Sequence, residues 1–169
     1  MTDGDQSAVT PSPIARDLLL RAVAIAAQAR ANGNHPFGAL LADAQGQVLL
    51  TAENTVVTNS DATGHAETNL VRLASARYSV AELEATVLYT STEPCAMCSG
   101  AIFWSGIGGV TYALAETTLY EFTGDDESNL TLELPCRTVF AAGRRQITVQ
   151  GPFELDEARA VHAGFWRVG

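Results

Sequence analysis

Four side chains in two short stretches could carry out chemistry together: His65 and Glu67 in the first, Cys95 and Cys98 in the second. Zinc is bound by imidazole nitrogen and thiolate sulfur, and a catalytic zinc site has three protein ligands and one open position. Two cysteines three residues apart lie on one face of a helix and can bind the same ion. We therefore predict a catalytic Zn²⁺ site with His65, Cys95 and Cys98 as its ligands.

Glu67 is predicted to be the catalytic proton carrier. It comes two residues after His65, so it can reach a water at the metal without binding the metal itself. Zinc lowers the pKa of a bound water to about 7. The H-x-E stretch together with Pro94-Cys95-Ala96-Met97-Cys98 resembles the pattern of zinc-dependent base deaminases. That resemblance implies a hydrolysis in which Glu67 takes a proton from the water, whose oxygen adds to the ring carbon that bears an amine. Glu67 then passes the proton to the adjacent ring nitrogen and assists the departure of ammonia.

Two other interpretations of these residues remain open at this point. A closed structural zinc site needs a fourth protein ligand, for which Cys136, His35 and His162 are available. A lone C-x-x-C pair can also be a redox motif. A closed site of the ribbon kind more usually has a second C-x-x-C pair, and a redox site has no use for His65 and Glu67, so catalytic zinc is favoured.

The ligands are expected where strands pass into helices, because Pro94 suits a helix start and polar loops precede both motifs. Helices are predicted over 65–78 and 95–105, so that the two helix starts meet around the ion. Strands alternating with helices indicate an α/β fold, a three-layer α/β/α domain. Further helices are expected over 14–31 and 154–165, and strands over 38–42, 48–57, 86–90, 109–113 and 147–149.

Composition argues against a nucleic-acid partner. The chain has 19 acidic and 10 basic residues, a net charge of −9, and all ten basic residues are arginines. Because neutralised phosphates provide most non-specific affinity for nucleic acids, such proteins carry basic surfaces. We therefore expect a small, neutral substrate.

Length and cysteine content indicate a single domain in a reducing compartment. In this chain of 169 residues, 1–12 are expected to be a disordered leader and 13–169 a single domain. Three cysteines, two of them in C-x-x-C spacing, indicate metal chemistry rather than a disulfide framework. No signal peptide or membrane span is recognisable, so we expect a cytoplasmic protein with no membrane partner.

The H-x-E and P-C-x-x-C stretches are typical of zinc-dependent base deaminases. In addition, Pro36-Phe37-Gly38-Ala39, Asn54 and the run from Glu93 to Ile102 resemble, in order, the cytidine and deoxycytidylate deaminase superfamily in its purine-acting branch. The resemblance extends over about residues 14 to 115. It implies a central mixed five-stranded sheet, one zinc per subunit and a homodimer.

The resemblance also implies roles in substrate binding. Asn54 would hydrogen-bond the base, Phe37 would form a wall of the pocket, and the backbone around Glu93 and Pro94 would meet the leaving amine. Asn69, one helical turn from His65, could face the pocket. Each of these residues also has a structural interpretation, as a loop cap or a core side chain.

The far wall of the pocket is predicted least securely. Guanine deaminases have a short Phe-Asp-Asp segment with a carboxylate that helps to read the purine, whereas 119–135 does not align securely with it. Tyr120, Phe165 and Trp166 could close over the base, or pack in the core. Acidic residues that could read the base, or belong to a solvated loop, are Glu121, Asp125, Asp126 and Glu154.

The preferred function is deamination of a free amino-purine or a related heterocyclic amine, such as guanine, isoguanine or an amino-triazine. Deamination of tRNA adenosine is an alternative that the acidic composition disfavours. A non-catalytic zinc-binding partner subunit is an alternative of another class, which the intact Glu67 disfavours.

Overall fold

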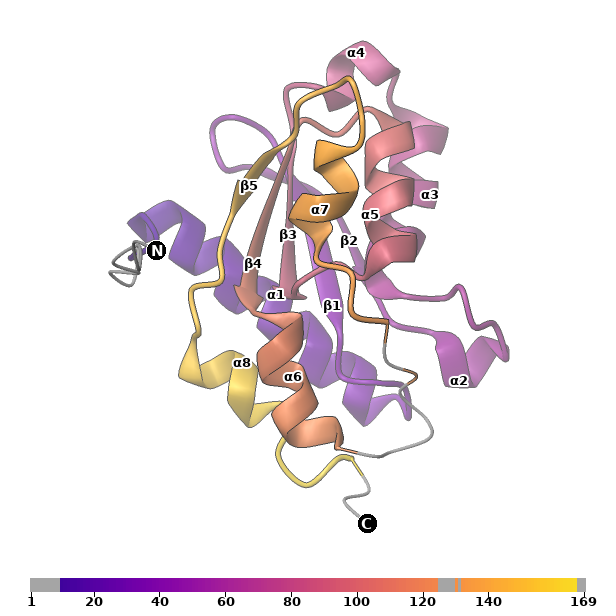
Figure 1. Ribbon diagram of the computed structural model, residues 1–169, viewed down its shortest axis with the longest axis vertical. Helices are drawn as coiled ribbons and strands as arrows, with labels where there is room; N and C mark the ends of the chain where they lie inside the picture. The colour runs from indigo at the N-terminus through magenta and orange to yellow at the C-terminus, as the bar shows by residue number, and fades with distance from the viewer. Residues whose placement is uncertain (1–9, 125–129, 131, 167–169) are drawn as a thin grey trace, which may run out of the picture.

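A computed structural model describes residues 10–124, 130 and 132–166, and shows a five-stranded sheet between two layers of helices (Figure 1). The strands are β1 (Gly38–Ala42), β2 (Val48–Glu53), β3 (Val87–Thr92), β4 (Gly109–Leu114) and β5 (Thr148–Gln150). Their order is β2-β1-β3-β4-β5; β1 is antiparallel to β2 and β3, whereas β3, β4 and β5 are parallel. The predicted mixed five-stranded α/β/α fold is confirmed.

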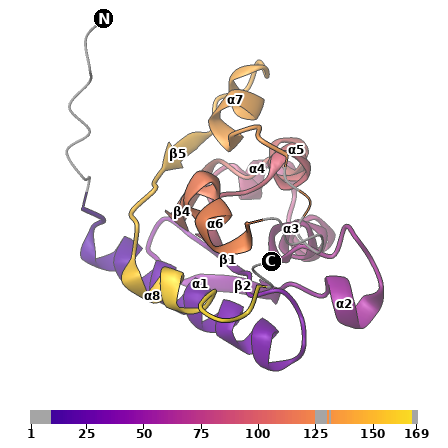
Figure 2. The ribbon, with the colours of Figure 1, turned by 60° about the horizontal axis from the view of Figure 1, so that its bottom comes forward.

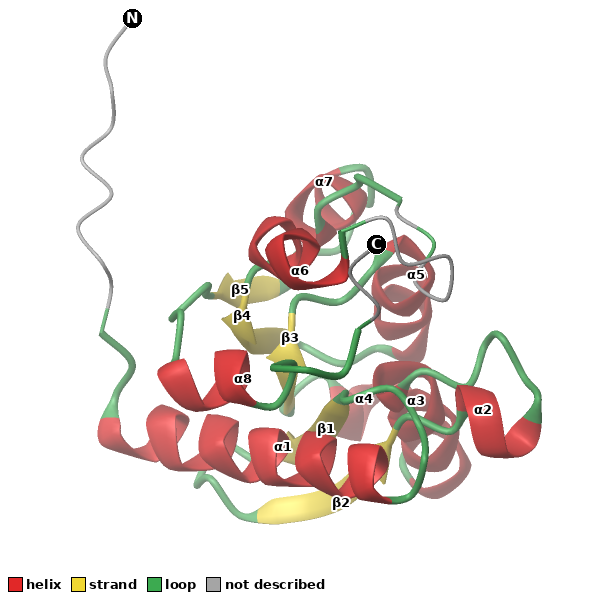
Figure 3. Ribbon diagram, turned by 90° about the horizontal axis from the view of Figure 1, so that it is seen from below, coloured by secondary structure: helices red, strands yellow, loops and turns green. Residues whose placement is uncertain are grey.

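The helices divide between the two faces of the sheet (Figure 3). Helices α1 (Pro13–Ala31) and α8 (Asp156–Ala160) lie on one face, and α3 (Ala66–Arg77), α5 (Ala96–Ser105) and α7 (Cys136–Ala141) on the other. Among the described residues no helix is both long and apolar enough to span a membrane.

Strand β1 is buried along its whole length because both of its faces are covered. Its alternate side chains enter different cores, as the two-residue repeat of a strand requires. Ala39 and Leu41 pack with α3 and α5, whereas Leu40 and Ala42 pack toward α1. This central strand fixes the sheet against both helix layers.

The strand predicted to reach residue 57 ends at Glu53. Asn54 is buried, and its Oδ1 accepts a hydrogen bond from the N–H of Val56 at 3.1 Å. A short polar side chain that bonds the backbone two residues ahead favours a turn over a continued strand. The short helix α2 (Val56–Asn59) follows.

Four short helices among the described residues were not predicted, and one predicted helix is shorter than expected. The additional helices are α2, α4 (Val80–Leu83), α6 (Glu116–Thr123) and α7. Helix α8 covers five residues of the predicted range 154–165, with Glu154 before it and Gly164 after it at positive φ. Residues 1–9 of the predicted leader, together with Asp125 and Asp126, lie outside the described residues.

Gly38 is the point where β1 comes closest to α1. A Cβ atom at this position would lie 2.5 Å from the carbonyl oxygen of Ala22, in the rigid backbone of α1. We expect Gly38→Ala to lower the free energy of unfolding by about 3 kcal/mol, the upper range for overpacking a core.

Denaturant unfolding followed by circular dichroism would measure this change. Gly100→Ala is the matched control, because nothing lies within 4 Å of its added Cβ in α5. There alanine should raise the free energy of unfolding by about 0.5–1 kcal/mol. Equal midpoints for the two variants would contradict the close approach of β1 to α1.

Candidate active site

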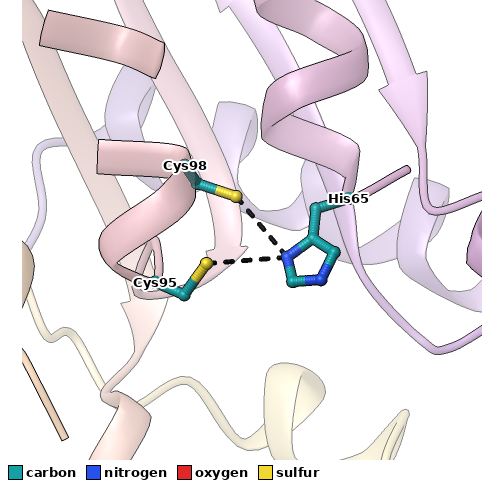
Figure 4. A group of neighbouring side chains, drawn as sticks. All are labelled: His65, Cys95 and Cys98. Carbon is teal, nitrogen blue, oxygen red and sulfur yellow. Dashed lines mark hydrogen bonds between the residues drawn. The ribbon is translucent and has the colours of Figure 1, made fainter. Parts of the chain in front are cut away.

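The three predicted zinc ligands come together at the starts of two neighbouring helices. His65 is the N-cap of α3, Cys95 is the N-cap of α5, and Cys98 lies in the first turn of α5. The Nδ1 atom of His65 is 3.6 Å from Sγ of Cys95 and 3.5 Å from Sγ of Cys98 (Figure 4). All three ligand atoms lie within 4.8 Å of one another.

These distances fit a tetrahedral zinc ion. Zn–S bonds of about 2.3 Å and Zn–N bonds of about 2.0–2.1 Å place a sulfur and a nitrogen ligand roughly 3.6 Å apart at the tetrahedral angle. The observed separations of 3.5 and 3.6 Å agree with that value. The cofactor is therefore Zn²⁺, held by His65, Cys95 and Cys98.

The thiols also have the electrostatics of a metal site. A hydrogen bond from Cys98, with a smaller contribution from His65, lowers the pKa of Cys95 to about 4. The pKa of Cys98 is raised well above its ordinary value, because its thiol shares its proton with Cys95 in that hydrogen bond and because it is buried. The pKa of His65 is raised, chiefly by its hydrogen bond with Cys95. A dication beside the two sulfurs would offset their repulsion and deprotonate both, as coordination of thiols does.

The group of metal-binding type found among the described residues has three members, which leaves the fourth position of a tetrahedron open. None of the residues considered as a fourth ligand belongs to it. The backbone N–H of Cys136 donates to Glu93, and His162 accepts a hydrogen bond from Trp166. His35 lines the neighbouring cavity. The arrangement is that of a catalytic site rather than a closed one.

Glu67 lies in the first turn of α3 and is buried next to the ligands. The Thr90 hydroxyl donates to its Oε1 at 2.9 Å, and the Cys98 thiol lies 3.5 Å from its Oε2. Burial raises the pKa of Glu67, since a charged carboxylate loses its hydration. A carboxyl group with a raised pKa can both accept and release a proton near neutral pH.

A cavity of about 200 Å³ opens beside this cluster, at the carboxyl ends of β3 and β4. In α/β sheets, this edge is where ligands commonly bind. Two residues of α6, Glu116 and Leu119, line this cavity. Figure 2 shows α6 between α8 on one side and α3 and α5 on the other. The residues that line the cavity are His35, Phe37, Val56, Ala62, His65, Glu67, Thr92, Glu93, Cys95, Glu116, Leu119 and Leu130.

Two predicted substrate-binding residues, Phe37 and Glu93, line this cavity. The Glu93 carboxylate accepts hydrogen bonds from the backbone N–H groups of Glu116 at 3.3 Å and Cys136 at 3.1 Å. It therefore joins the starts of α6 and α7 to the end of β3. Pro94, which is buried, accepts a hydrogen bond from the Ser99 hydroxyl through its carbonyl oxygen.

The two predicted asparagines have different surroundings. Asn54 does not line the cavity: its backbone N–H donates to the carbonyl oxygen of Phe37 at 3.1 Å, and its buried Nδ2 has no hydrogen-bond partner among the described residues. Asn69 lies outside the cavity: its Nδ2 donates to the carbonyl oxygens of Glu53 and Gly64 and to the Thr55 hydroxyl. The structure therefore places Asn69 as a brace of the loop before His65, not as a substrate contact.

Glu154 is placed elsewhere than predicted. Its Oε1 accepts hydrogen bonds from the N–H of Ala115 and the hydroxyl of Thr118, and its Oε2 pairs with Arg159 at 3.1 Å. These contacts hold the start of α6, so Glu154 is a structural anchor rather than a base reader. Glu121 is largely exposed on α6.

The C-terminal aromatic residues lie behind the cavity wall. Trp166 is buried, with its ring 6.0 Å from Phe37 and 5.4 Å from His35, while Phe165 lies 6.1 Å from His35. They support two wall residues, and do not line the cavity themselves. Tyr120 likewise does not line it and lies beside Glu116; burial raises its pKa.

His162 in this aromatic group gives a pH-dependent prediction. Its ring is buried and accepts a hydrogen bond from the Trp166 indole, and burial, with a smaller effect of Arg30, lowers its pKa to about 4. Because the unfolded chain protonates near pH 6.5, stability is complete above that pH and is lost as the pH falls toward 4. As the pH falls from 6.5 to 4, protonation of His162 in the unfolded chain should lower the free energy of unfolding by up to about 3 kcal/mol.

Thermal unfolding of the wild type and of His162→Gln at several pH values between 7 and 4 would measure this contribution. The variant should be less stable at pH 7 but should lose less stability on acidification. Parallel curves for the two proteins would show that His162 does not cause the loss.

Six residues that line the cavity are not among the candidate site residues predicted from the sequence: Val56, Ala62, Thr92, Glu116, Leu119 and Leu130. Glu116 faces the cavity, and burial, with Cys95 nearby, raises its pKa to about 7. Thr92 is buried, and its hydroxyl has no partner among the described residues. Leu119 is apolar. Their positions in the sequence could have indicated two of the six residues: Thr92 is the last residue of β3, and Glu116 follows the end of the parallel strand β4.

Comparison with known proteins agrees with this geometry. Residues 13–114 match the family model of the cytidine and deoxycytidylate deaminase zinc-binding region. The chain is 42% identical to a Schizosaccharomyces pombe protein named "Probable cytosine deaminase", covering 89% of this chain and 91% of the relative. Curated tRNA-specific adenosine deaminases also match, one from Haemophilus influenzae at 31% identity over 67% of this chain and 69% of that protein.

Solved structures give the same result. The guanine deaminase of Bacillus subtilis is 38% identical over 67% of this chain and 71% of that chain, with a TM-score of 0.58. A protein crystallised with 2,6-diaminopurine is 26% identical and covers 95% of this chain and 87% of its own, with a TM-score of 0.73. With a zinc site of the right geometry, a buried glutamate beside it and these matches, the chain belongs to the cytidine and deoxycytidylate deaminase family.

Proposed function

We propose that this chain is a hydrolytic deaminase of a free amino-purine or a related amino-heterocycle, such as guanine, isoguanine or an amino-triazine. The observation that carries the proposal is the cavity beside Glu67: it holds about 200 Å³, and its charged lining residues are acidic. No arginine lines it among the described residues, so it offers a phosphate no cationic partner. The relatives named for guanine and cytosine deamination support the same class of substrate.

In the proposed reaction Glu67 carries two protons in succession. Zinc held by His65, Cys95 and Cys98 would supply Lewis-acid chemistry and make water acidic at neutral pH. Glu67 accepts a proton as the water oxygen adds to the amine-bearing carbon, and delivers it to the adjacent ring nitrogen. Glu67 then takes the proton of the newly added hydroxyl group and passes it to the amine, so that the carbon–nitrogen bond breaks, ammonia leaves and a carbonyl remains on the ring.

Thr90 holds Glu67 in place for both transfers. Its hydroxyl lies 2.9 Å from Oε1 of Glu67 and 3.0 Å from the carbonyl oxygen of Thr92. A carboxylate fixed by a hydrogen bond from the sheet keeps one oxygen oriented while the other faces the ligand cluster. Such preorganisation avoids a reorganisation cost during the reaction.

Ammonia release from the zinc-loaded protein tests the proposal. The panel should contain guanine, isoguanine, adenine, cytosine, ammeline, adenosine, cytidine and guanosine, because the relatives do not define one ring. Turnover of a free base supports the proposal. If the protein deaminated a tRNA anticodon stem-loop but none of these bases, it would be a tRNA adenosine deaminase. The acidic composition of the chain argues against that alternative.

We also propose that the chain forms a homodimer. The outer face of α5 exposes Met97 and 84% of Trp104, and Leu73 on the neighbouring α3 is half exposed. Apolar side chains gathered on adjacent helices are typical of protein–protein contact surfaces. Light scattering should therefore give about twice 17.8 kDa. A mass near 17.8 kDa would contradict the dimer, and Trp104→Glu should shift the mass toward that value.

A further inference from the structure

The first turn of α6 is held by two carboxylates. Oε2 of Glu93 accepts a hydrogen bond from the N–H of Glu116 at 3.3 Å. Oε1 of Glu154 accepts from the N–H of Ala115 at 3.2 Å and from the Thr118 hydroxyl at 3.1 Å. Glu93 joins α6 to the end of β3, and Glu154 joins α6 to the segment after β5. The position of the first turn of α6 at the cavity is therefore fixed.

Glu116 is the charged side chain that this turn places in the cavity. It lies close enough to the reacting end for its charge to act on His65, Cys95 and Glu67. Of the three glutamates that line the cavity, Glu67 faces Thr90 and the ligands, and Glu93 binds two backbone N–H groups. Glu116 interacts with the Tyr120 side chain and also lines the cavity, and a carboxylate has acceptor positions beyond that one partner, so Glu116 can still meet a ligand.

The surroundings of Glu116 limit what it can recognise. In its ionised form, which prevails above about pH 7, the Glu116 carboxylate only accepts hydrogen bonds, so its partner must then be an N–H or O–H group. Leu119 and Leu130 form the apolar part of the same wall. The several hydroxyls of a ribose would lose hydration against leucines without gaining partners, which is costly. A flat ring with a single N–H directed at Glu116 has no such cost.

We propose that Glu116 accepts a hydrogen bond from the ring N–H that a nucleoside replaces with its glycosidic bond, and that this contact makes the cavity select free bases. The inference rests on the proposed function, because it assigns the base-reading group of the same site. It places that group at the start of α6, before the 119–135 segment in which a base reader was expected.

Calorimetric titration in a Glu67→Ala background tests the contact without turnover. The probes are guanine with guanosine and cytosine with cytidine, each added to the zinc-loaded protein. Three proteins are compared: Glu67→Ala alone, Glu67→Ala with Glu116→Gln, and Glu67→Ala with Glu121→Gln. The last is the matched control, because Glu121 lies on the same helix with 66% of its side chain exposed. Zinc content and circular dichroism confirm that each variant is folded and loaded.

We expect at least one base to bind about tenfold or more tightly than its nucleoside, since hydrogen bonds to charged groups are the stronger ones. Glu116→Gln should abolish most of that preference, and Glu121→Gln should retain it. A preference unchanged in Glu116→Gln, or the absence of any preference for bases, would overturn the inference. So would a larger loss for nucleosides, which would assign Glu116 to a sugar hydroxyl.

Failure of the proposed function would be seen separately. Ammonia release is measured on the wild type, whereas base selection is measured as dissociation constants in the Glu67→Ala background. If the protein selects bases but releases no ammonia, the role of Glu116 is supported and the proposed deamination is contradicted. If the protein deaminates bases but Glu116→Gln leaves base selection unchanged, the proposed deamination is supported and the role of Glu116 is contradicted.

Discussion

Glu67→Ala is expected to lower kcat for ammonia release by about 10³-fold or more while the protein keeps its zinc. The side chain is buried, does not belong to the metal-binding group, and carries out both proton transfers in the proposed reaction. General acid–base catalysis by one positioned group contributes about 10²–10⁴-fold. Because alanine leaves the three ligands intact, zinc content should stay at one ion per chain.

The measurement combines steady-state kinetics on the best base with metal analysis of the same sample. Glu67→Gln is the closer variant, since it keeps the size and a hydrogen-bond acceptor for Thr90 but cannot take up the proton. Both variants should be equally inactive. Substantial activity in either one would remove Glu67 from the reaction. Loss of zinc along with activity would mean that Glu67 supports the metal instead.

Cys98→Ala is expected to lose zinc and, with it, all measurable ammonia release. Cys98 supplies one of three ligand atoms and is completely buried between α3 and α5. Two remaining ligands do not make up the usual three of a catalytic zinc site. Because a metal bound only by the native state stabilises it by mass action, the variant should also unfold at a lower temperature.

The matched control is Cys136→Ala, which changes a second buried cysteine outside the metal-binding group. It should keep one zinc per chain and lose only the stability that core truncation costs. Excess chelator should lower the unfolding temperature of the wild type and of Cys136→Ala, but not that of Cys98→Ala. Full zinc and activity in Cys98→Ala would mean that the ligand assignment is wrong.

The chemistry of the site could be predicted from sequence because short-range geometry fixes it. Cys95 and Cys98 are in one helical turn, and the residue types leave little choice of metal. The five strands and the principal helices were predicted correctly in kind, because short apolar runs bounded by turn residues indicate strands and helical spacing of apolar residues indicates helices. The β2 boundary was missed because one buried side chain, Asn54, bends the chain at a point where the apolar pattern continues into Val56 and Val57.

The cavity wall could not be predicted because long-range contacts build it. Helices α6 and α7 are short, and carboxylates distant in sequence hold the first turns of both: Glu93 bonds both starts, and Glu154 bonds α6. No local repeat encodes such a contact. For the same reason the sequence leaves open whether Glu154 and Asn69 contact a substrate, whereas the structure shows both using polar atoms inside the protein. Polar residue type alone does not distinguish a binding group from a brace.

The attachment of α6 and α7 to the Glu93 side chain has a consequence for how this domain can diversify. Its carboxylate holds α6 and α7 through backbone N–H groups, which every residue except proline supplies. Side chains at the first positions of these helices can therefore change while their attachment to β3 persists. The metal ligands and Glu67 lie within residues 13–114, whereas Glu116 and Leu119 lie outside that range. Mutation can thus exchange the recognised ring while the inherited hydrolytic machinery remains untouched.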